Sequence, residues 1–176
     1  MLSRPQPGSE HLYAKFEDED QVYRVSAAAA NLAIDPIVYR DSVALALDPQ
    51  AVTRITLRKQ GREQAVTREA GPAWMPAPPL SGPVDAAAIA AVLELAAALR
   101  VVRYERAPSG DLALYGLAEP RAALTFGLSG QTGIQKTVLL GADSEDRGVY
   151  GMVQGQDVLW VLDRDAADRL LRDMTR

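Results

Sequence analysis

The stretch VYGMVQGQDVLWVLDRDAADRLL, residues 149–171, carries the pattern that decides the fold. Residues 149–153 and 157–162 are β-rich runs separated by a short polar turn, which is typical of a hairpin. The second run is apolar at every position from 158 to 162, and such strands are covered on both faces of a sheet. Asp163 can cap a following helix whose alanines and leucines form one apolar face. The stretch therefore predicts a strand, a tight turn, a second strand and a capped helix.

The same order of elements occurs near the start of the chain. Residues 13–16 (YAKF) precede the acidic loop 17–20, and residues 22–25 (VYRV) precede Ser26 and an alanine-rich helix that ends near Ile34. The offset between the two copies is about 137 positions, with a one-residue slip in the loop. Because the first copy lacks the strands that precede the second, we expect the chain to begin inside the final third of a preceding repeat.

The region between these copies predicts a second hairpin, a helix and further strands. Alternating apolar residues in 53–59 and 62–68 flank a Gln-Gly turn, which indicates a hairpin. Residues 72–83 form a proline-rich extended connector whose Trp74 is expected to dock on the core. Helical spacing of apolar residues from Asp85 to Leu99 predicts a helix. Further strands are predicted at 101–106, 122–128 and 135–140.

The expected fold class is α+β, a mostly antiparallel β-sheet with packed helices. One complete repeat is expected to be preceded by a partial repeat. The expected divisions are a flexible lead-in at 1–10, a partial repeat of hairpin plus helix at 11–41, and a complete α+β repeat domain at 42–176.

Composition narrows the classes of function. The 176-residue chain has 23 acidic residues against 19 Lys and Arg, a net charge of −4, and a pI near 5.0. This balance argues against nucleic acid as a partner. The absence of cysteine and the single histidine exclude disulfides, thiolate metal sites and multi-histidine metal sites. No stretch of the sequence can span a bilayer and the start has no signal-peptide core, so we expect the chain itself to be soluble.

No segment carries a catalytic or cofactor-binding pattern. Residues 127–137 (GLSGQTGIQKT) have the look of a phosphate-binding loop, but Gln135 stands where a glycine should precede Lys136, and a strand follows in place of a helix. A hairpin loop is the favoured interpretation. The acidic turns at 17–20 and 143–146 lack the ligand spacing of a calcium loop. We therefore predict that the protein is not an enzyme and has no catalytic residues, no metal site and no cofactor.

Four arginines on the second predicted hairpin form the candidate interaction surface: Arg54, Arg58, Arg62 and Arg68. An acidic protein partner would pair with them. The alternative is a solvated outer face on which neighbouring glutamates neutralise the arginines.

The stretch DLALYGLAEP, residues 111–120, resembles a known family together with its flanks. With them it resembles the bacterial domain of unknown function family 4340 (DUF4340), over about residues 50–171. The flanking pieces that carry the resemblance are a helix at 92–99, a strand at 101–104, an apolar strand at 122–128, the TVLLG ending at 137–141, and the hairpin strands that begin at 149 and 158.

The YGLxxP motif within this stretch has a structural explanation as a corner of the chain. Tyr115 and Leu117 are expected to anchor in the core, Gly116 to supply a positive φ, and Pro120 to fix the entry into the next strand. Where the family commonly has Asp after the leucine of the motif, this chain has Ala118.

The resemblance also implies a cellular role. Similar domains look like extracytoplasmic domains behind an N-terminal membrane helix, often beside ABC-type export systems, including gliding-motility-like ones. By this resemblance we expect a non-catalytic interaction or scaffold domain of a bacterial envelope protein, accessory to an ABC-type transport system whose subunits are its protein partners. We expect it on the periplasmic face of the inner membrane, within a longer anchored protein. The alternative is a ligand-binding module for a glycan or peptide, in a groove near Trp74 and the proline-rich connector.

Overall fold

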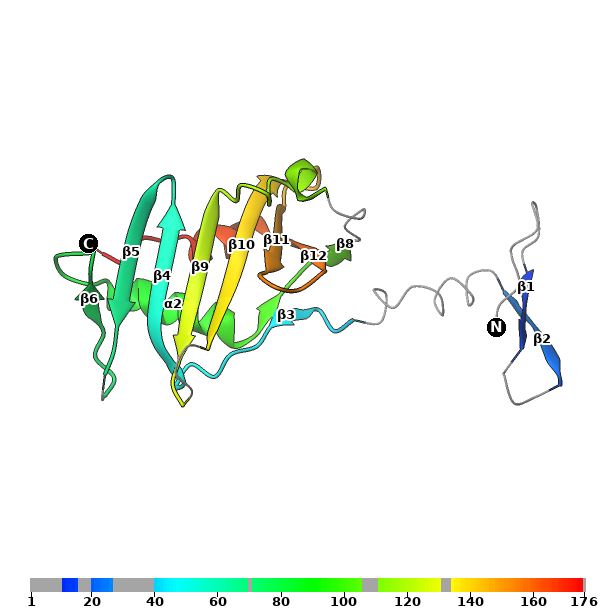
Figure 1. Cartoon of the computed structure of the whole chain (residues 1–176), viewed down its shortest axis with the longest axis horizontal. Helices are drawn as coiled ribbons and strands as arrows, with labels where there is room; N and C mark the ends of the chain where they lie inside the picture. The colour runs from blue at the N-terminus through cyan, green and yellow to red at the C-terminus, as the bar shows by residue number, and fades with distance from the viewer. Residues whose placement is uncertain are drawn as a thin grey trace. The chain divides into compact units, whose positions relative to one another are not determined.

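The computed structural model describes residues 11–15, 20–26, 40–69, 71–105, 111–130 and 134–175 (Figure 1). The chain divides into two units, residues 1–40 and residues 41–176. Each unit is described by itself below.

In the first unit, the described residues form an antiparallel hairpin of β1 (His11–Lys15) and β2 (Val22–Ser26). Its register pairs Ala14 with Tyr23 and Lys15 with Val22. The hairpin predicted from the sequence is therefore confirmed. The predicted lead-in at 1–10 and the predicted helix after Ser26 lie outside the described residues.

The second unit is built on an eight-stranded sheet with the order β6-β5-β4-β9-β10-β11-β12-β8 (Figure 1). Every neighbouring pair in it is antiparallel, as the sequence predicts. A second, two-stranded sheet joins β3 to β7. The strands are β3 (Val43–Leu45), β4 (Val52–Lys59), β5 (Arg62–Thr67), β6 (Met75–Ala77), β7 (Leu99–Arg100), β8 (Arg103–Glu105), β9 (Ala122–Leu128), β10 (Gln135–Asp143), β11 (Val149–Val153) and β12 (Leu159–Leu162).

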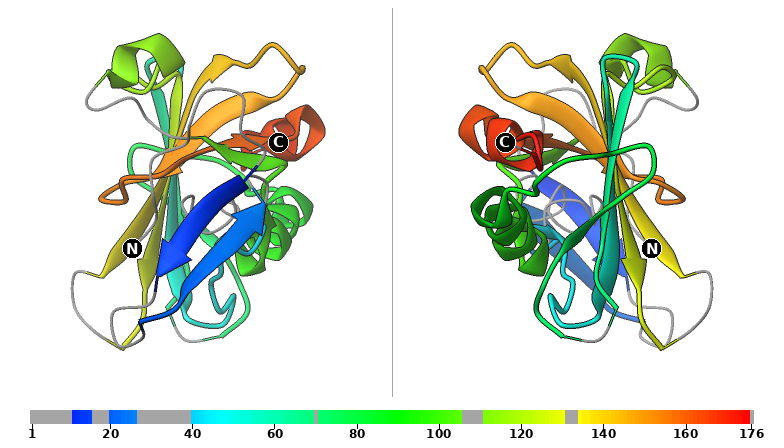
Figure 2. Two further views of the ribbon diagram at one scale, coloured as in Figure 1. Left: turned by 90° about the vertical axis from the view of Figure 1, so that its right-hand side faces the viewer. Right: turned by 90° about the vertical axis from the view of Figure 1, so that its left-hand side faces the viewer.

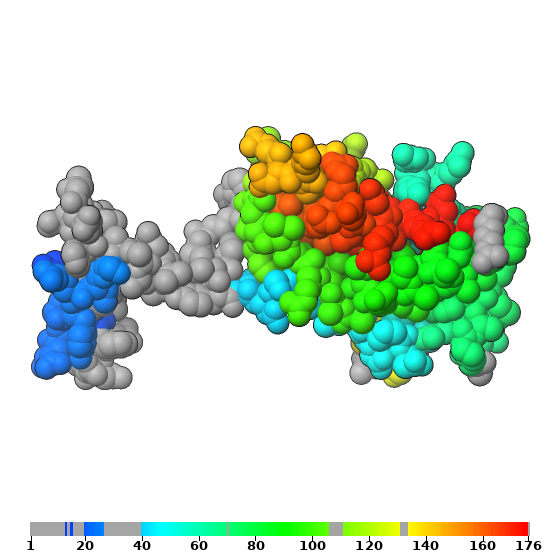
Figure 3. Space-filling view, turned by 180° about the vertical axis from the view of Figure 1, so that it is seen from behind, coloured from blue at the N-terminus to red at the C-terminus, as the bar shows by residue number. Residues whose placement is uncertain are grey.

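Two helices, α2 (Ala86–Ala97) and α3 (Arg164–Leu170), lie on the same face of the large sheet (Figures 2 and 3). Each begins at the aspartate expected to cap it. The Asp85 carboxylate accepts hydrogen bonds from the Ala87 and Ala88 amides at 3.0 and 3.1 Å. The Asp163 carboxylate does the same for two amides of the first turn of α3. Because such caps satisfy amides that have no partner within the helix, they fix where each helix starts.

The main core lies between this sheet face and the helices. Trp160, the largest fully buried side chain in the described part, is 1% exposed. It belongs to a core cluster that contains apolar residues of β4, β5, β9, β10 and β11 and residues of α2. The buried face of α2 consists of Ala88, Ile89, Val92, Leu93 and Ala96. All four residues of β12 are buried, which confirms that this strand is covered on both faces.

Two details of the chain path differ from the prediction. Within the proline-rich connector, Met75–Ala77 forms strand β6, which pairs with β5. The strand predicted at 101–106 is confirmed only for β8, Arg103–Glu105, because the chain changes partners just before it. The Val101 amide donates to Ser42 and the Val102 amide donates to Val161, so β7 joins the small sheet and β8 joins the large one. Trp74 is half-buried and packs against the core, as expected.

The YGLxxP motif forms a tight corner on the sheet face opposite the helices (Figure 2). A short 3-10 helix, η2 (Leu112–Tyr115), ends at Gly116, whose φ is 64°. The Leu117 amide donates to the Leu112 carbonyl at 2.9 Å, and the Leu117 side chain packs with Met152 and Leu159 in a second, smaller core cluster. The structural role predicted for the motif is therefore confirmed for its glycine and its leucine.

Two glycines allow the corner to lie directly on β10. A Cβ at Gly116 would stand 2.7 Å from the Ala142 amide nitrogen, and one at Gly141 would stand 2.1 Å from the Tyr115 carbonyl oxygen. Both distances are far shorter than a carbon atom tolerates. The edge of the Tyr115 ring meets Tyr150 with ring centroids 4.9 Å apart, and this contact holds the corner against β11.

We expect Gly116→Ala to destabilise the fold more than Gly61→Ala does. Both glycines have a positive φ, 64° and 72°, but a Cβ at Gly61 meets nothing within 4 Å. Backbone strain at Gly61 should cost about 1 kcal/mol, and the clash at Gly116 should add about 1–3 kcal/mol. Urea unfolding of both variants measures the difference. Equal losses would show that the corner does not need its close approach to β10.

Candidate functional site

The sheet face opposite α2 and α3 carries short polar side chains over four strands, and we call it the open face. It consists of the outward residues of β5, β4, β9 and β10, which Figure 1 views frontally. The register places Thr56, Thr125 and Thr137 side by side across β4, β9 and β10. The hydroxyl oxygens of Thr125 and Thr137 lie 3.0 Å apart. A row of hydroxyl groups therefore crosses the open face.

A shallow groove of about 470 Å³ runs over the open face. Its floor is made of small side chains, because Arg54 pairs with Gly127 and Arg58 pairs with Ala123 across the β4–β9 ladder. Amide side chains contribute at one end. The groove is lined by Arg54, Thr56, Arg58, Glu63, Ala123, Thr125, Gly127, Gln135, Thr137, Leu139 and Gln154.

Two of the four predicted arginines belong to this groove. Arg58 donates to Glu63 at 2.6 Å, with its side chain 72% exposed and that of Glu63 31% exposed. This pair is the neutralised face that the sequence analysis gave as the alternative. Arg54 is also exposed, and it forms no ion pair with any residue that the structure describes. Arg54 is thus a cation in the groove that remains available to a bound carboxylate.

The structure does not bring Arg62 and Arg68 to the open face. Arg62 lines a separate hollow of about 200 Å³ with Lys59 and Asp173. The half-buried Arg68 instead holds the chain together. It donates to the carbonyls of Val52 at 2.7 Å and Gln50 at 2.9 Å and also to that of Pro49, and its guanidinium lies 5.0 Å from the centre of the Trp74 ring. The predicted cluster of four arginines therefore separates into three environments.

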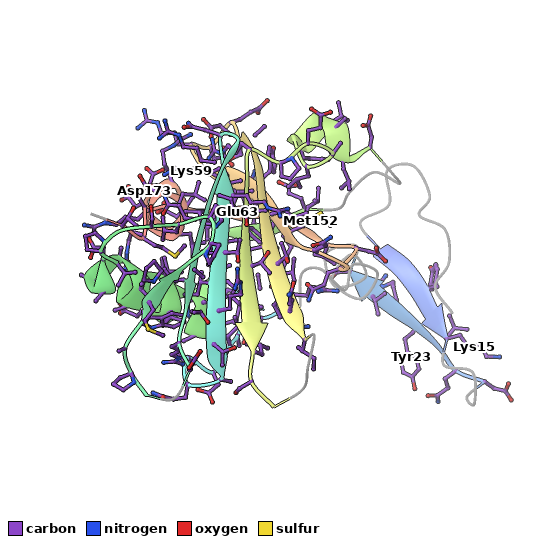
Figure 4. All side chains as sticks on the ribbon, turned by 60° about the vertical axis from the view of Figure 1, so that its left-hand side comes forward. Lys15, Tyr23, Lys59, Glu63, Met152 and Asp173 are labelled. Atoms are coloured by element: carbon purple, nitrogen blue, oxygen red, sulfur yellow. The ribbon has the colours of Figure 1, made fainter. Side chains whose placement is uncertain are left out.

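Sequence reasoning missed an ion-pair network at the ends of β4, β9, β10 and α3. The Lys59 ammonium donates to the Asp173 carboxylate at 2.9 Å and to the Leu171 carbonyl at 2.8 Å (Figure 4). This hydrogen bond from Lys59 lowers the pKa of Asp173 below its ordinary value. These partners are 112 and 114 positions from Lys59, so no local pattern could have joined them.

The second ion-pair group centres on Asp143. Its carboxylate accepts from Arg164 at 2.7 Å and from Arg121 at 2.8 Å, and these hydrogen bonds hold the pKa of Asp143 below its ordinary value, with Arg164 the larger cause. Arg164 is in α3, Arg121 directly precedes β9, and Asp143 is the last residue of β10. They join strand ends to the last helix, which is a structural role.

The described residues assemble no group of three or more histidine, aspartate or glutamate side chains that would hold a metal ion. Lys136, the lysine of the loop weighed for phosphate binding, lies within strand β10. Residues 131–133 of that loop fall outside the described part of the chain. In the ranges that the structure covers, no helix has the length and apolar character needed to cross a membrane.

Comparison with known families matches residues 2–81 and 74–175 to the domain of unknown function DUF4340. The chain belongs to this family. The match confirms the resemblance drawn from the YGLxxP corner and its flanks, and extends DUF4340 toward the start of the chain. No curated protein and no solved structure matches the chain.

We expect Arg68→Ala to destabilise the protein and Arg54→Ala to leave its stability nearly unchanged. The first change removes hydrogen bonds to three carbonyls and the contact with Trp74, for a loss of about 1–3 kcal/mol. The second removes an exposed side chain and should stay within about 0.5 kcal/mol. Chemical denaturation of both variants measures the contrast. Similar losses would contradict the division of the arginines into structural and available groups.

Asp143→Asn should destabilise the protein at neutral pH and have little effect in acid. Because the pKa of Asp143 is lowered in the folded state, its stabilising effect is present above the pKa of an unfolded aspartate, near 3.9, and is lost as the pH falls through the folded-state value. Melting temperatures of the two proteins, measured from pH 7 downward, should converge once the pH falls below the lowered folded-state pKa of Asp143. In an Arg121→Gln/Arg164→Gln background the pH-dependent difference should vanish. A constant difference at every pH would contradict the assignment.

Proposed function

We propose that this DUF4340 protein is a non-catalytic interaction domain that binds a protein partner through its open face. The observation that carries the proposal is the groove of about 470 Å³ on this face, with Arg54 in it and no helix of the described residues over it. The opposite face of the same sheet is covered by α2 and α3.

The side chains of the open face suit protein binding. Threonine, alanine and glycine lose little side-chain entropy when a partner covers them. A partner can therefore bury a surface made of them at a small entropic cost. Arginine is enriched where interfaces are strongest, and it binds carboxylates through two donors. Arg54 and Arg58 lie four residues apart on β4, a separation of about 13 Å along a strand. An extended acidic segment of a partner would reach both.

The family resemblance supports the setting of this contact. We propose an envelope protein, exposed on the periplasmic face of the inner membrane as part of a longer anchored protein, and accessory to an ABC-type transport system. Transporter subunits are then the partners expected at the open face.

We also propose that the chain contains a partial and a complete repeat. Support comes from the ladder registers of the two hairpins. Ala14 pairs with Tyr23 as Gly151 pairs with Trp160, and every such equivalence lies 137 positions apart. The offset is thus the same on both strands of the hairpin, without the one-residue slip in the loop that the sequence comparison gave. Ser26 then corresponds to Asp163, the residue that caps α3.

A ligand-binding module is the second candidate, and the composition of the groove favours it. Its hydroxyl and amide side chains match the hydrogen-bonding groups of a glycan or of an extended peptide. Trp74, near which this site was expected, is occupied by Arg68 and packs on the core. Calorimetric binding of a soluble glycan that is lost on Thr125→Val but survives Arg54→Glu would favour this candidate.

Affinity purification of the full-length protein from gently solubilised native membranes tests the leading proposal. Transporter subunits should be recovered with the native protein and lost with the Arg54→Glu/Arg58→Glu variant. The matched control is Arg62→Glu/Arg172→Glu, which makes the same charge change on exposed residues outside the groove. Recovery of no partner, equal recovery with both variants, or turnover of a small substrate by the purified protein would overturn the proposal.

A further inference from the structure

The hairpin β1–β2 has the backbone register of β11–β12 but not its surroundings. In the second unit, β11 has β10 on its other side and β12 has β8 on its other side. Among the described residues, β1 and β2 form a sheet of two strands. An isolated two-stranded hairpin is only marginally stable in water. The second hairpin, β11–β12, therefore shows two neighbouring strands that the described residues do not supply to β1–β2.

Burial differs sharply between equivalent positions of the two hairpins. Trp160 is 1% exposed, whereas Tyr23 at the same register position is 38% exposed. Leu159 is 0% exposed, whereas Val22 at the equivalent position is 61% exposed. The two pairs lie on opposite faces of their strands, since successive side chains of a strand alternate. The first hairpin thus exposes apolar side chains at two positions that the second buries, one on each face.

We propose that β1–β2 inserts into a second sheet of the DUF4340 type, in the way that β11–β12 lies between β10 and β8 in this chain. That second sheet would have strands equivalent to β10 and β8, here called β10-like and β8-like, whose edges are unpaired. A hairpin that fills this place is called a closing hairpin. This inference rests on the repeat proposed above, but not on the open-face contact. Pairing would place β1 against the β10-like strand and β2 against the β8-like strand. Backbone hydrogen bonds along both ladders would hold it, and Tyr23 and Val22 would take the buried positions that Trp160 and Leu159 occupy here.

A second copy of this chain does not fit as the partner. In this chain the edges of β10 and β8 are already paired with β11 and β12. Displacing them would expose Trp160, Leu159 and the rest of a fully buried strand. The partner must therefore be a related sheet that lacks its own closing hairpin.

Hydrogen exchange on the unmodified chain tests the inference with a peptide of residues 134–144, which contains β10, as the probe. At millimolar peptide, amide exchange in residues 11–15 should slow while exchange in 149–162 stays unchanged. The matched control is the same peptide with Leu139→Pro, which cannot continue a ladder and should have no effect. An equal effect of both peptides, or dimerisation of the chain through this hairpin, would overturn the inference.

A second experiment uses a fusion protein, so that its result does not depend on how tightly a free peptide binds. Residues 41–148 joined in front of the full chain supply a sheet with open edges, and exchange in 11–15 and 22–26 should slow by at least about tenfold. Residues 41–176 joined in the same way supply a sheet whose edges are occupied, and exchange should stay fast. If the first fusion does not fold, the peptide result decides. If exchange slows in neither experiment, the inference is wrong. That result would not affect the open-face proposal, because Arg54 and Arg58 are unchanged in both experiments.

Discussion

The contact between Trp160 and Gly151 is the constraint on which the large sheet depends. A Cβ at Gly151 would stand 2.2 Å from the Trp160 ring, so the indole lies directly against the backbone of the neighbouring strand. Burying an indole gains about 4–6 kcal/mol from apolar area. The Trp160 Nε1 donor has no hydrogen-bond partner among the described residues, at a cost of about 1–3 kcal/mol. The free energy gained by burying the indole is therefore larger than the cost of leaving its N–H group without an acceptor.

This contact explains why the two faces of the sheet differ. Trp160 fixes the β11–β12 register, and β12 leads through the Asp163 cap straight into α3. α3 lies beside α2 and completes the cover of one face (Figure 3). On the other face, the YGLxxP corner covers the end of β10 and the side near β11 and β12, where Leu117, Met152 and Leu159 pack together. The groove lies over β4, β9 and β10, on the same face as that corner. The uncovered groove is thus a consequence of where the apolar side chains are placed.

Local patterns predicted the elements of this fold well, and long-range geometry explains what they missed. Caps at Asp85 and Asp163 and the positive φ at Gly116 follow from chemistry within a few residues. Whether Met75–Ala77 pairs depends on β5, and the change of partner near Val101 depends on Ser42, far away in sequence. The arginines show the same limit for the candidate site. Spacing placed them on one hairpin, but Arg68 faces Trp74 and distant carbonyls, which only the folded chain brings together.

The distribution of charge bears on the contact that we propose for the open face. In the described part of the chain, several cations already form ion pairs: Arg121 and Arg164 with Asp143, Lys59 with Asp173, and Arg169 with Glu94 at 3.6 Å. The protein as a whole carries a net charge of −4, so acidic partners are repelled at long range. Arg54 acts against that background over short distances only, because salt screens exposed charges within about 8–10 Å. Under the proposed function, a partner would therefore have to fit the small-residue floor before its carboxylate gained from Arg54, so shape would be the first requirement and charge the second.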